Sequence, residues 1–272
     1  MNLMMLFCFF ISPTLKASDY SKSSLKISII IPCSYKHAQL LHPLLKLYAQ
    51  QTVLPYEVII SLSEASKAPG EYIRQIEYGR WPFHIKLLFS EFKHYAGTNR
   101  NIACSRATGD IFICQDADDI PHPQRVEIIK YFFEHYDIDH LLHLFTLSKN
   151  SAPLPFLDPQ TIELAHETKY EKARTYNPKI HNGCPAITRE VFDRIQWPDT
   201  AHHEDGIFNY KVYQNFKNCM ILRASLYIYR NELSSWANNV ASSSSCYGEK
   251  IYQEFYRNYP TLKPKSRTIS NK

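Results

Sequence analysis

The sequence predicts an α/β domain in which a mostly parallel β-sheet is flanked by helices. Short apolar, β-branched runs alternate with segments of helical periodicity from residue 26 onward, and the connections between them are short. The 272 residues are 44% hydrophobic and 14% aromatic, which describes a packed globular protein with a large core. Only 7 glycines occur, and neither G-x-G-x-x-G nor G-x-x-x-x-G-K is present. Dinucleotide-binding folds with a glycine-rich turn and P-loop enzymes are therefore disfavoured.

The individual elements follow one another in a regular order. Residues 27–31 form a β-branched run ended by Pro32, which is typical of a strand buried on both faces. Leucines at helical spacing follow over residues 40–48, where Pro43 is compatible only with the first turn of a helix. Gly109 suits the C-terminal cap of a short helix over residues 98–107. We further expect strands over residues 58–62, 85–89, 111–114, 141–147 and 224–229, and helices over residues 72–76, 126–133 and 207–216.

An acidic cluster follows the fourth of these strands, and ligands in such sheets bind outside the carboxyl ends of the strands. The segment QDADD comes directly after residues 111–114 and holds Asp116, Asp118 and Asp119. Neighbouring carboxylates are costly to ionise without a cation, and hard oxygen ligands suit Mg²⁺ or Mn²⁺ shared with substrate phosphates. The alternative is a strand-to-helix turn in which Asp119 caps the next helix, but capping accounts for only one of the acids.

The motifs of the chain stand in a characteristic order. An opening strand, ISIIIP, is followed by QTVLPYEVII, then by NRNIACSRATGDIFICQDADD, HHEDGIFNY and LYIYRNELS. In this order they resemble family 2 glycosyltransferases of the GT-A fold, over about residues 26–235. That family has an opening strand ending in Pro, a Q-x-x-x-P-x-E motif, an Arg-Asn and small-Gly-Asp block before DxDD, a later Glu-Asp pair and a closing strand. The resemblance implies a GT-A fold and transfer of a sugar from a nucleotide-diphosphate sugar.

The resemblance also implies a donor site. Asp116 and Asp118 would occupy the DxD positions, with Asp118 binding a Mn²⁺ or Mg²⁺ ion that bridges the diphosphate and Asp116 close to the ribose or the metal. Such an ion neutralises the charge that develops on the departing nucleoside diphosphate. Arg100 would lie near the diphosphate, and its alternative is an exposed helix residue. The nucleotide-facing edge after the first strand would be formed by Pro32, Cys33 and Ser34.

A second acidic pair, Glu204 and Asp205, would supply the catalytic base. In the family the acid at the position of Asp205 deprotonates the acceptor hydroxyl, and the transfer inverts the anomeric centre; this requires a carboxylate separate from the metal site. The alternative is a pair of acids that favours the dipole of the helix they begin. One departure concerns the base of the nucleotide: the family's Asp-Asp-Gly-Ser is replaced by residues 61–66, SLSEAS. Ser63 could hydrogen-bond a base edge, or Glu64 could substitute at a shifted register, so the base is left open.

We therefore predict a metal-dependent, inverting glycosyltransferase with a nucleotide-sugar donor and a hydroxyl acceptor on a glycan, lipid or protein. A phosphohydrolase is disfavoured, because its Asp-x-Asp would follow the first strand. A non-catalytic nucleotide- or glycan-binding protein of the same fold remains the alternative. The net charge of +5 comes from scattered basic residues, so no nucleic-acid partner is expected.

The sequence predicts one catalytic domain over residues 25–235, between a signal-like or apolar extension over residues 1–22 and a Ser-rich, basic extension over residues 236–272. The apolar stretch 3–11 is too short to span a bilayer, which takes about 20 residues. It suits either a signal peptide cut near Ala17 or an apolar anchor, although no basic residue precedes it. The expected location is the cytoplasm or the periphery of a membrane, with export as the alternative and the N-terminus as the only membrane contact.

Overall fold

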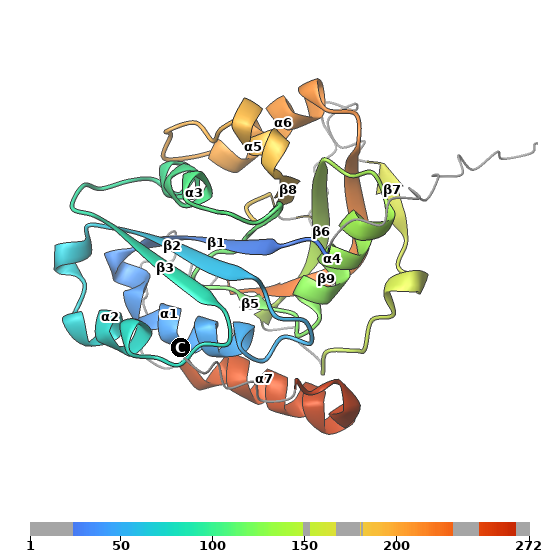
Figure 1. The fold of residues 1–272 in the computed structure, drawn as a ribbon, viewed down its shortest axis with the longest axis horizontal. Helices are drawn as coiled ribbons and strands as arrows, with labels where there is room; N and C mark the ends of the chain where they lie inside the picture. Colours follow the sequence, from blue (N-terminus) through green and yellow to red (C-terminus); the bar gives the residue numbers. More distant parts are fainter. Residues whose placement is uncertain (1–23, 149–152, 167–179, 181, 231–244, 265–272) are drawn as a thin grey trace, which may run out of the picture.

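A computed structural model describes residues 24–148, 153–166, 180, 182–230 and 245–264. Its centre is a nine-stranded sheet in the order β3-β2-β1-β4-β8-β6-β9-β5, with β7 added alongside β9. The predicted α/β fold, a sheet with helices on both faces, is confirmed (Figure 1). None of the helices within the described ranges is both long and apolar enough to cross a bilayer.

The first half of the sheet is parallel, as expected from alternating strands and helices. It consists of β1 (Ile27–Ser34), β2 (Glu57–Ser63), β3 (His84–Ser90) and β4 (Ile111–Cys114). Beyond β4 the directions are mixed, because the short β8 (Ala186–Thr188) runs antiparallel to both of its neighbours. The remaining strands are β5 (Ile120–Pro121), β6 (His140–Leu147), β7 (Leu164–His166) and β9 (Cys219–Tyr229), of which only β6 and β9 pair in parallel.

Helices cover both faces of the sheet (Figure 1). One face carries α1 (Ala38–Tyr48), α2 (Gly70–Glu77), α4 (Arg125–His135) and α7 (Ser245–Asn258), and the other α3 (Ala96–Ser105), α5 (Arg189–Arg194) and α6 (Glu204–Asn215). Alternate residues of β1 serve the two layers: Ile29 and Ile31 pack with Leu45 of α1, whereas Ile30 joins the cluster of Phe112 and Phe208. Short 3₁₀ turns cover Tyr35–His37, Ala65–Lys67, Pro159–Thr161 and Pro260–Leu262.

Two expectations about single residues were wrong. Pro43 lies in the middle of α1 and not in its first turn, so tertiary packing of the buried leucines around it tolerates the lost hydrogen bond. Gly109 does not cap a helix: α3 ends at Ser105, and no glycine of the described chain has a positive φ. Gly109 is needed for close approach instead, because a Cβ there would lie 2.4 Å from Ser28 Oγ.

The buried carboxylate of Glu57 ties the amino ends of the central strands together. Its Oε1 accepts hydrogen bonds from Ser28 Oγ (2.8 Å), from the N–H and Oγ1 of Thr108 (2.5 and 2.9 Å) and from the Gly109 N–H (3.2 Å). Its Oε2 pairs with Lys86 Nζ of β3 at 3.0 Å. This network fixes the register of β1, β2 and β3 at the end of the sheet opposite the acidic cluster.

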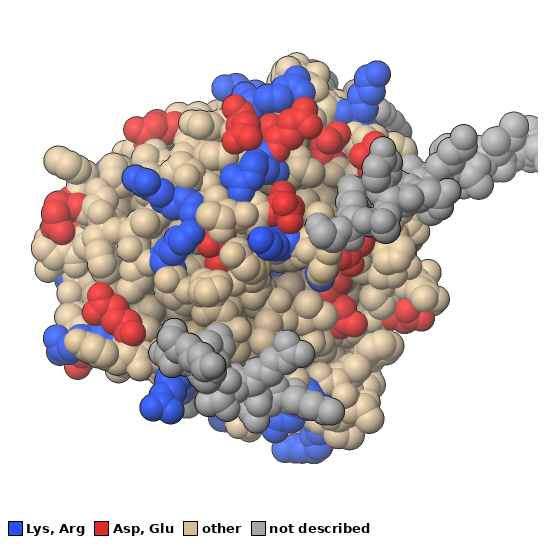
Figure 2. Space-filling view, in the orientation of Figure 1, with Lys and Arg blue, Asp and Glu red and all other residues tan. Residues whose placement is uncertain are grey.

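Several expectations concern residues outside the described ranges. The signal-like stretch with its cut near Ala17 lies there, and so do parts of the C-terminal extension expected over residues 236–272. In the C-terminal stretch expected as an extension, α7 packs against α1 and buries Tyr252 and Phe255 in the core (Figure 1). On the face shown in Figure 2, basic and acidic side chains are interspersed.

Candidate active site

A cavity of about 890 Å³ opens at the carboxyl ends of β1, β2 and β4. This is the edge at which the sequence predicts ligand binding. Residues predicted for the donor and base sites meet here although they come from four distant segments. The predicted residues that line the cavity are Pro32, Cys33, Ser34, Arg100, Asp116, Asp118, Glu204 and Asp205.

Ser63 is the one predicted site residue that does not line the cavity. Its side chain is fully buried, donating to the Cys33 carbonyl at 3.3 Å and accepting from Asn99 Nδ2 at 3.2 Å. The chain turns at the next residue, Glu64, which adopts a left-handed φ of 54° and does line the cavity. The carboxylate of Glu64 pairs with Lys67 Nζ at 2.5 Å. Glu64, and not Ser63, therefore lines the cavity after β2.

The buried side chain of Gln115 hydrogen-bonds to the acidic loop between β4 and β5. The buried amide of Gln115 donates to the carbonyls of Asp116 (2.9 Å) and Asp119 (3.2 Å), and it accepts from Arg125 Nη1 at 2.5 Å. Burial, together with the charge of Asp116, raises the pKa of Asp118 to about 7. A cation beside Asp118 would restore its ionised form.

Arg100 connects the two acidic pairs. It is 1% exposed on α3, and its guanidinium donates from Nη2 to Asp116 Oδ1 at 2.8 Å and from Nη1 to Asp205 Oδ1 at 2.6 Å. Glu204 Oε1 lies 3.7 Å from the same Nη1. Burial alone would lower the pKa of Arg100, but Asp205 and Asp116 raise it above its usual value. The reading of Arg100 as an exposed helix residue is wrong.

Asp205 lies in the first turn of α6, which begins at Glu204, and the φ of 64° at the preceding His203 turns the chain into the helix. Burial raises the pKa of Asp205 to about 7, against the lowering effect of Arg100 and with further raising by Asp116 and Glu204. A carboxylate with this pKa can accept a proton near neutral pH, which suits general-base catalysis.

The helices that carry Arg100 and Asp205 are locked together. The side-chain amide of Asn101 of α3 donates to the backbone carbonyl of Trp197 at 2.8 Å and accepts from the backbone N–H of Trp197 at 3.0 Å. The indole of Trp197 stacks on Phe208 of α6, with ring centroids 3.7 Å apart. Gly97 permits the close approach, because a Cβ there would lie 2.7 Å from the Pro198 carbonyl oxygen. These contacts fix the distance between the two acidic pairs.

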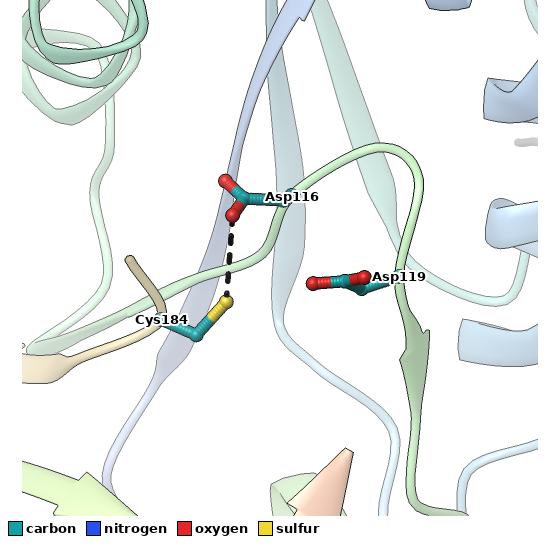
Figure 3. A group of neighbouring side chains, drawn as sticks. All are labelled: Asp116, Asp119 and Cys184. Carbon is teal, nitrogen blue, oxygen red and sulfur yellow. Dashed lines mark hydrogen bonds between the residues drawn. The ribbon is translucent and has the colours of Figure 1, made fainter. Parts of the chain in front are cut away.

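Asp119 and Cys184 also lie beside the acidic loop, and only Cys184 was not assigned by the sequence. Asp119 does not cap a helix, since its Oδ1 accepts from the Arg230 N–H at 2.9 Å and α4 begins only at Arg125. Asp116 Oδ2 accepts from Cys184 Sγ at 3.9 Å, and Asp119 faces the same space (Figure 3). Within the described ranges, Asp116, Asp119 and Cys184 form a group with the spacing of a metal site, and Asp118 is not part of it. No sequence pattern links Cys184 to the loop.

Several solved structures share this fold at low sequence identity. A Staphylococcus aureus TarS fragment, residues 1–349, in complex with UDP-GlcNAc is 17% identical with a TM-score of 0.61, covering 88% of this chain and 74% of that one. A mannosyltransferase from Pyrobaculum calidifontis in complex with GDP-Man and Mn²⁺ is 14% identical with a TM-score of 0.54, covering 93% and 69%. A glucosyl-3-phosphoglycerate synthase from Mycobacterium tuberculosis, in complex with Mn²⁺, UDP and glucosyl-3-phosphoglycerate, is 15% identical with a TM-score of 0.53, covering 89% and 82%.

The sequence itself identifies the family. No curated protein matches the chain. The family model described as glycosyl transferase family 2 matches residues 28–195, from β1 to the loop after α5. This match spans more than half of the 272 residues and includes the acidic loop and Arg100. The chain therefore belongs to glycosyl transferase family 2.

Proposed function

We propose that the chain transfers a glycosyl group from a nucleotide-diphosphate sugar to a hydroxyl acceptor with inversion at the anomeric carbon. The domain that does this would span residues 25–235. The observation that carries the proposal is the Arg100 bridge, which joins Asp116 at 2.8 Å and Asp205 at 2.6 Å on one wall of the cavity. It holds a candidate base beside a candidate donor-site acid, at the distance set by one guanidinium.

Asp205 would act as the general base. Its carboxylate takes the proton of the acceptor hydroxyl while the oxygen attacks the anomeric carbon and the bond to the diphosphate breaks. The bonding electrons leave with the nucleoside diphosphate, so one displacement inverts the anomeric centre. Arg100 would keep the Asp205 carboxylate oriented, and Glu204 would add negative charge that favours proton uptake. Transfer should therefore weaken as the pH falls below about 7.

Asp118 and Asp116 would hold a divalent ion. Both line the cavity, and their oxygen ligands suit Mn²⁺ or Mg²⁺. The raised pKa of Asp118 fits a group whose ionised form needs a nearby cation. Such an ion supplies charge stabilisation for the departing diphosphate. Two of the similar structures contain Mn²⁺, one with GDP-Man and one with UDP, which supports this assignment.

The nucleotide would lie against Pro32, Cys33 and Ser34. The buried Ser63 hydroxyl is already hydrogen-bonded to Cys33 and Asn99, so Glu64 is the candidate for binding the base. The acceptor, a hydroxyl on a glycan, lipid or protein, would approach Asp205 from the side of Asn182 and His202, which line the same cavity.

A ligand-stabilisation experiment on the full chain tests the proposal. Melting temperatures are measured with UDP, GDP, ADP and CDP, each with and without Mn²⁺, because a ligand of the folded state raises the apparent Tm. We expect a rise that needs one nucleotide and Mn²⁺ together, is lost in Asp118→Ala and survives in the exposed-acid control Asp193→Ala. Absence of any rise in a folded sample would refute the donor site.

Turnover separates an enzyme from a binding protein of the same fold. Release of the nucleoside diphosphate from the matching nucleotide-sugar is measured for the wild type and for Asp205→Asn. We expect Asp205→Asn to retain the nucleotide-induced rise in Tm and to lose turnover by about 10²-fold or more. Nucleotide binding with no turnover in the wild type, across donors of the matching base, would favour the binding protein.

A further inference from the structure

The buried carboxylate of Asp119 has no task in the proposed transfer. Its side chain is 1% exposed, and its Oδ1 accepts from the Arg230 N–H at 2.9 Å. Its Oδ2 is buried and has no hydrogen-bond partner among the residues that the structure describes. A buried carboxylate oxygen without a partner is costly, so this atom calls for a cation or a proton.

Two other ligand atoms face the same space (Figure 3). Asp116 Oδ2 and Cys184 Sγ lie 3.9 Å apart, and the ligand atoms of Asp116, Asp119 and Cys184 all lie within 4.8 Å of one another. Around a tetrahedral Zn²⁺, with bonds of about 2.3 Å to sulfur and 2.1 Å to oxygen, a sulfur and an oxygen lie about 3.6 Å apart. The space between the three side chains therefore fits one ion after a small inward movement.

Each ligand group is held from outside by a different arginine. Arg100 Nη2 donates to Asp116 Oδ1 at 2.8 Å, and the Arg230 N–H donates to Asp119 Oδ1. Arg125 Nη2 donates to the Cys184 carbonyl at 3.3 Å. The outer oxygen of each carboxylate is thus occupied and the inner one is available. Outer contacts of this kind orient metal ligands in known sites.

We infer that Asp116, Asp119 and Cys184 bind one divalent transition-metal ion. It lies beside the ion proposed for Asp118, Asp116 and the donor diphosphate, and the Asp116 carboxylate is shared between the two positions. A thiolate combined with two carboxylates favours Zn²⁺ or Co²⁺ over Mg²⁺. When the ion binds, the sulfur–metal bond replaces the Cys184 S–H bond and the proton is released to solvent. The ion enters from the cavity, which Asp116 lines with 22% of its side chain exposed.

The function of this ion would be to fasten the acidic loop. Asp116 and Asp119 belong to the connection between β4 and β5, whereas Cys184 belongs to the segment that leads into β8. An ion between them would hold Asp118 in place before any nucleotide arrives. Binding at this site therefore requires no nucleotide, unlike the ion of the donor complex.

Cobalt spectroscopy tests the inference directly, since a thiolate ligand adds a sulfur-to-cobalt charge-transfer band in the near ultraviolet. The full chain, stripped of metal with a chelator, is titrated with Co²⁺ at pH 7.5 in the absence of nucleotide. We expect the band to saturate at one equivalent per chain, to be abolished by added Zn²⁺ and to resist a large excess of Mg²⁺. Absence of the band in folded wild-type protein would overturn the inference.

Variants assign the ligands. We expect Cys184→Ser to remove the band, Asp119→Asn to weaken cobalt binding at least tenfold, and Cys219→Ala, a buried thiol outside the group, to leave the band unchanged. Asp118→Asn should also keep it, so that failure of the donor site and failure of this site are distinguished. Each variant is checked for folding by circular dichroism. A band that survives Cys184→Ser, or an Asp119→Asn variant that binds cobalt as tightly as the wild type, would refute the site.

Discussion

Replacing Arg100 by Gln tests whether the bridge between the acidic pairs stabilises the fold as well as the site. The Arg100 side chain is 2% exposed and contacts Asp116 and Asp205, whose side chains are 22% and 21% exposed. Removing one partner of a buried ion pair costs about 3–5 kcal/mol, because the remaining charges are left uncompensated. The partial exposure of the two acids places the expected loss near the lower end, about 3 kcal/mol at pH 8.

The pH dependence of this loss follows from the sign of the pKa changes. Arg100 lowers the pKa of Asp205, so its removal raises that pKa further above the present value of about 7. At pH 8 Asp205 of the wild type is ionised and its charge is compensated by Arg100, which the variant lacks. At pH 6 Asp205 is largely protonated in both proteins, so the cost of losing Arg100 falls. Arg100→Gln should therefore be most destabilising at pH 8 and clearly less so at pH 6.

Urea unfolding followed by tryptophan fluorescence measures the free energy of unfolding at both pH values. The double variant Arg100→Gln with Asp205→Asn is the control, because the neutral amide needs no cation. We expect Arg100→Gln to lower the free energy of unfolding by at least about 1 kcal/mol less in the Asp205→Asn protein than in the wild type. Double-mutant cycles between contacting residues give couplings of about 0.5–3 kcal/mol. A loss below about 1 kcal/mol at pH 8, the range of exposed pairs, or a loss that is equal at both pH values, would refute the bridge.

Three further outcomes are expected. Glu57→Gln should lower the free energy of unfolding by about 2–3 kcal/mol near neutral pH in urea titrations. Hydrogen bonds overcome burial and lower the Glu57 pKa below 4.5, so this difference should persist down to pH 4.5 and fade only below it. Burial lowers the pKa of His140 from 6.5 to about 4, so the free energy of unfolding should decrease as the pH is lowered from 6.5 to 4. His140→Gln keeps an N–H for Asn209 and should reduce this pH dependence by the uptake of about one proton. Gly97→Ala should lower the Tm, at a cost of about 1–3 kcal/mol, because its Cβ meets the Pro198 carbonyl, whereas Gly206→Ala in α6 meets nothing and should not.

The sequence alone determined most strands and helices up to residue 229, but not β5, β7, β8, α5 or α7. It also determined the edge of the sheet where the candidate site lies. Apolar, mostly β-branched runs such as residues 27–31 favour strands buried on both faces, and parallel strands place their carboxyl ends at one edge. The acids of the DADD segment and the pair Glu204 and Asp205 were visible because their local spacing and order carry the signal. These features depend on residues that are close together in the chain.

Contacts between distant segments were decided by the tertiary structure. Three contacts join residues that are far apart in the chain. Arg100 bonds to Asp205, Cys184 bonds to Asp116 of the acidic loop, and Ser63 bonds to Cys33 behind the cavity wall. The direction of a side chain at the end of a strand depends on how the backbone turns there. The left-handed φ of Glu64 places this residue, and not Ser63, at the cavity. Burial also sets the pKa of Asp205 and Asp118, and burial is a property of the packed fold and not of local sequence.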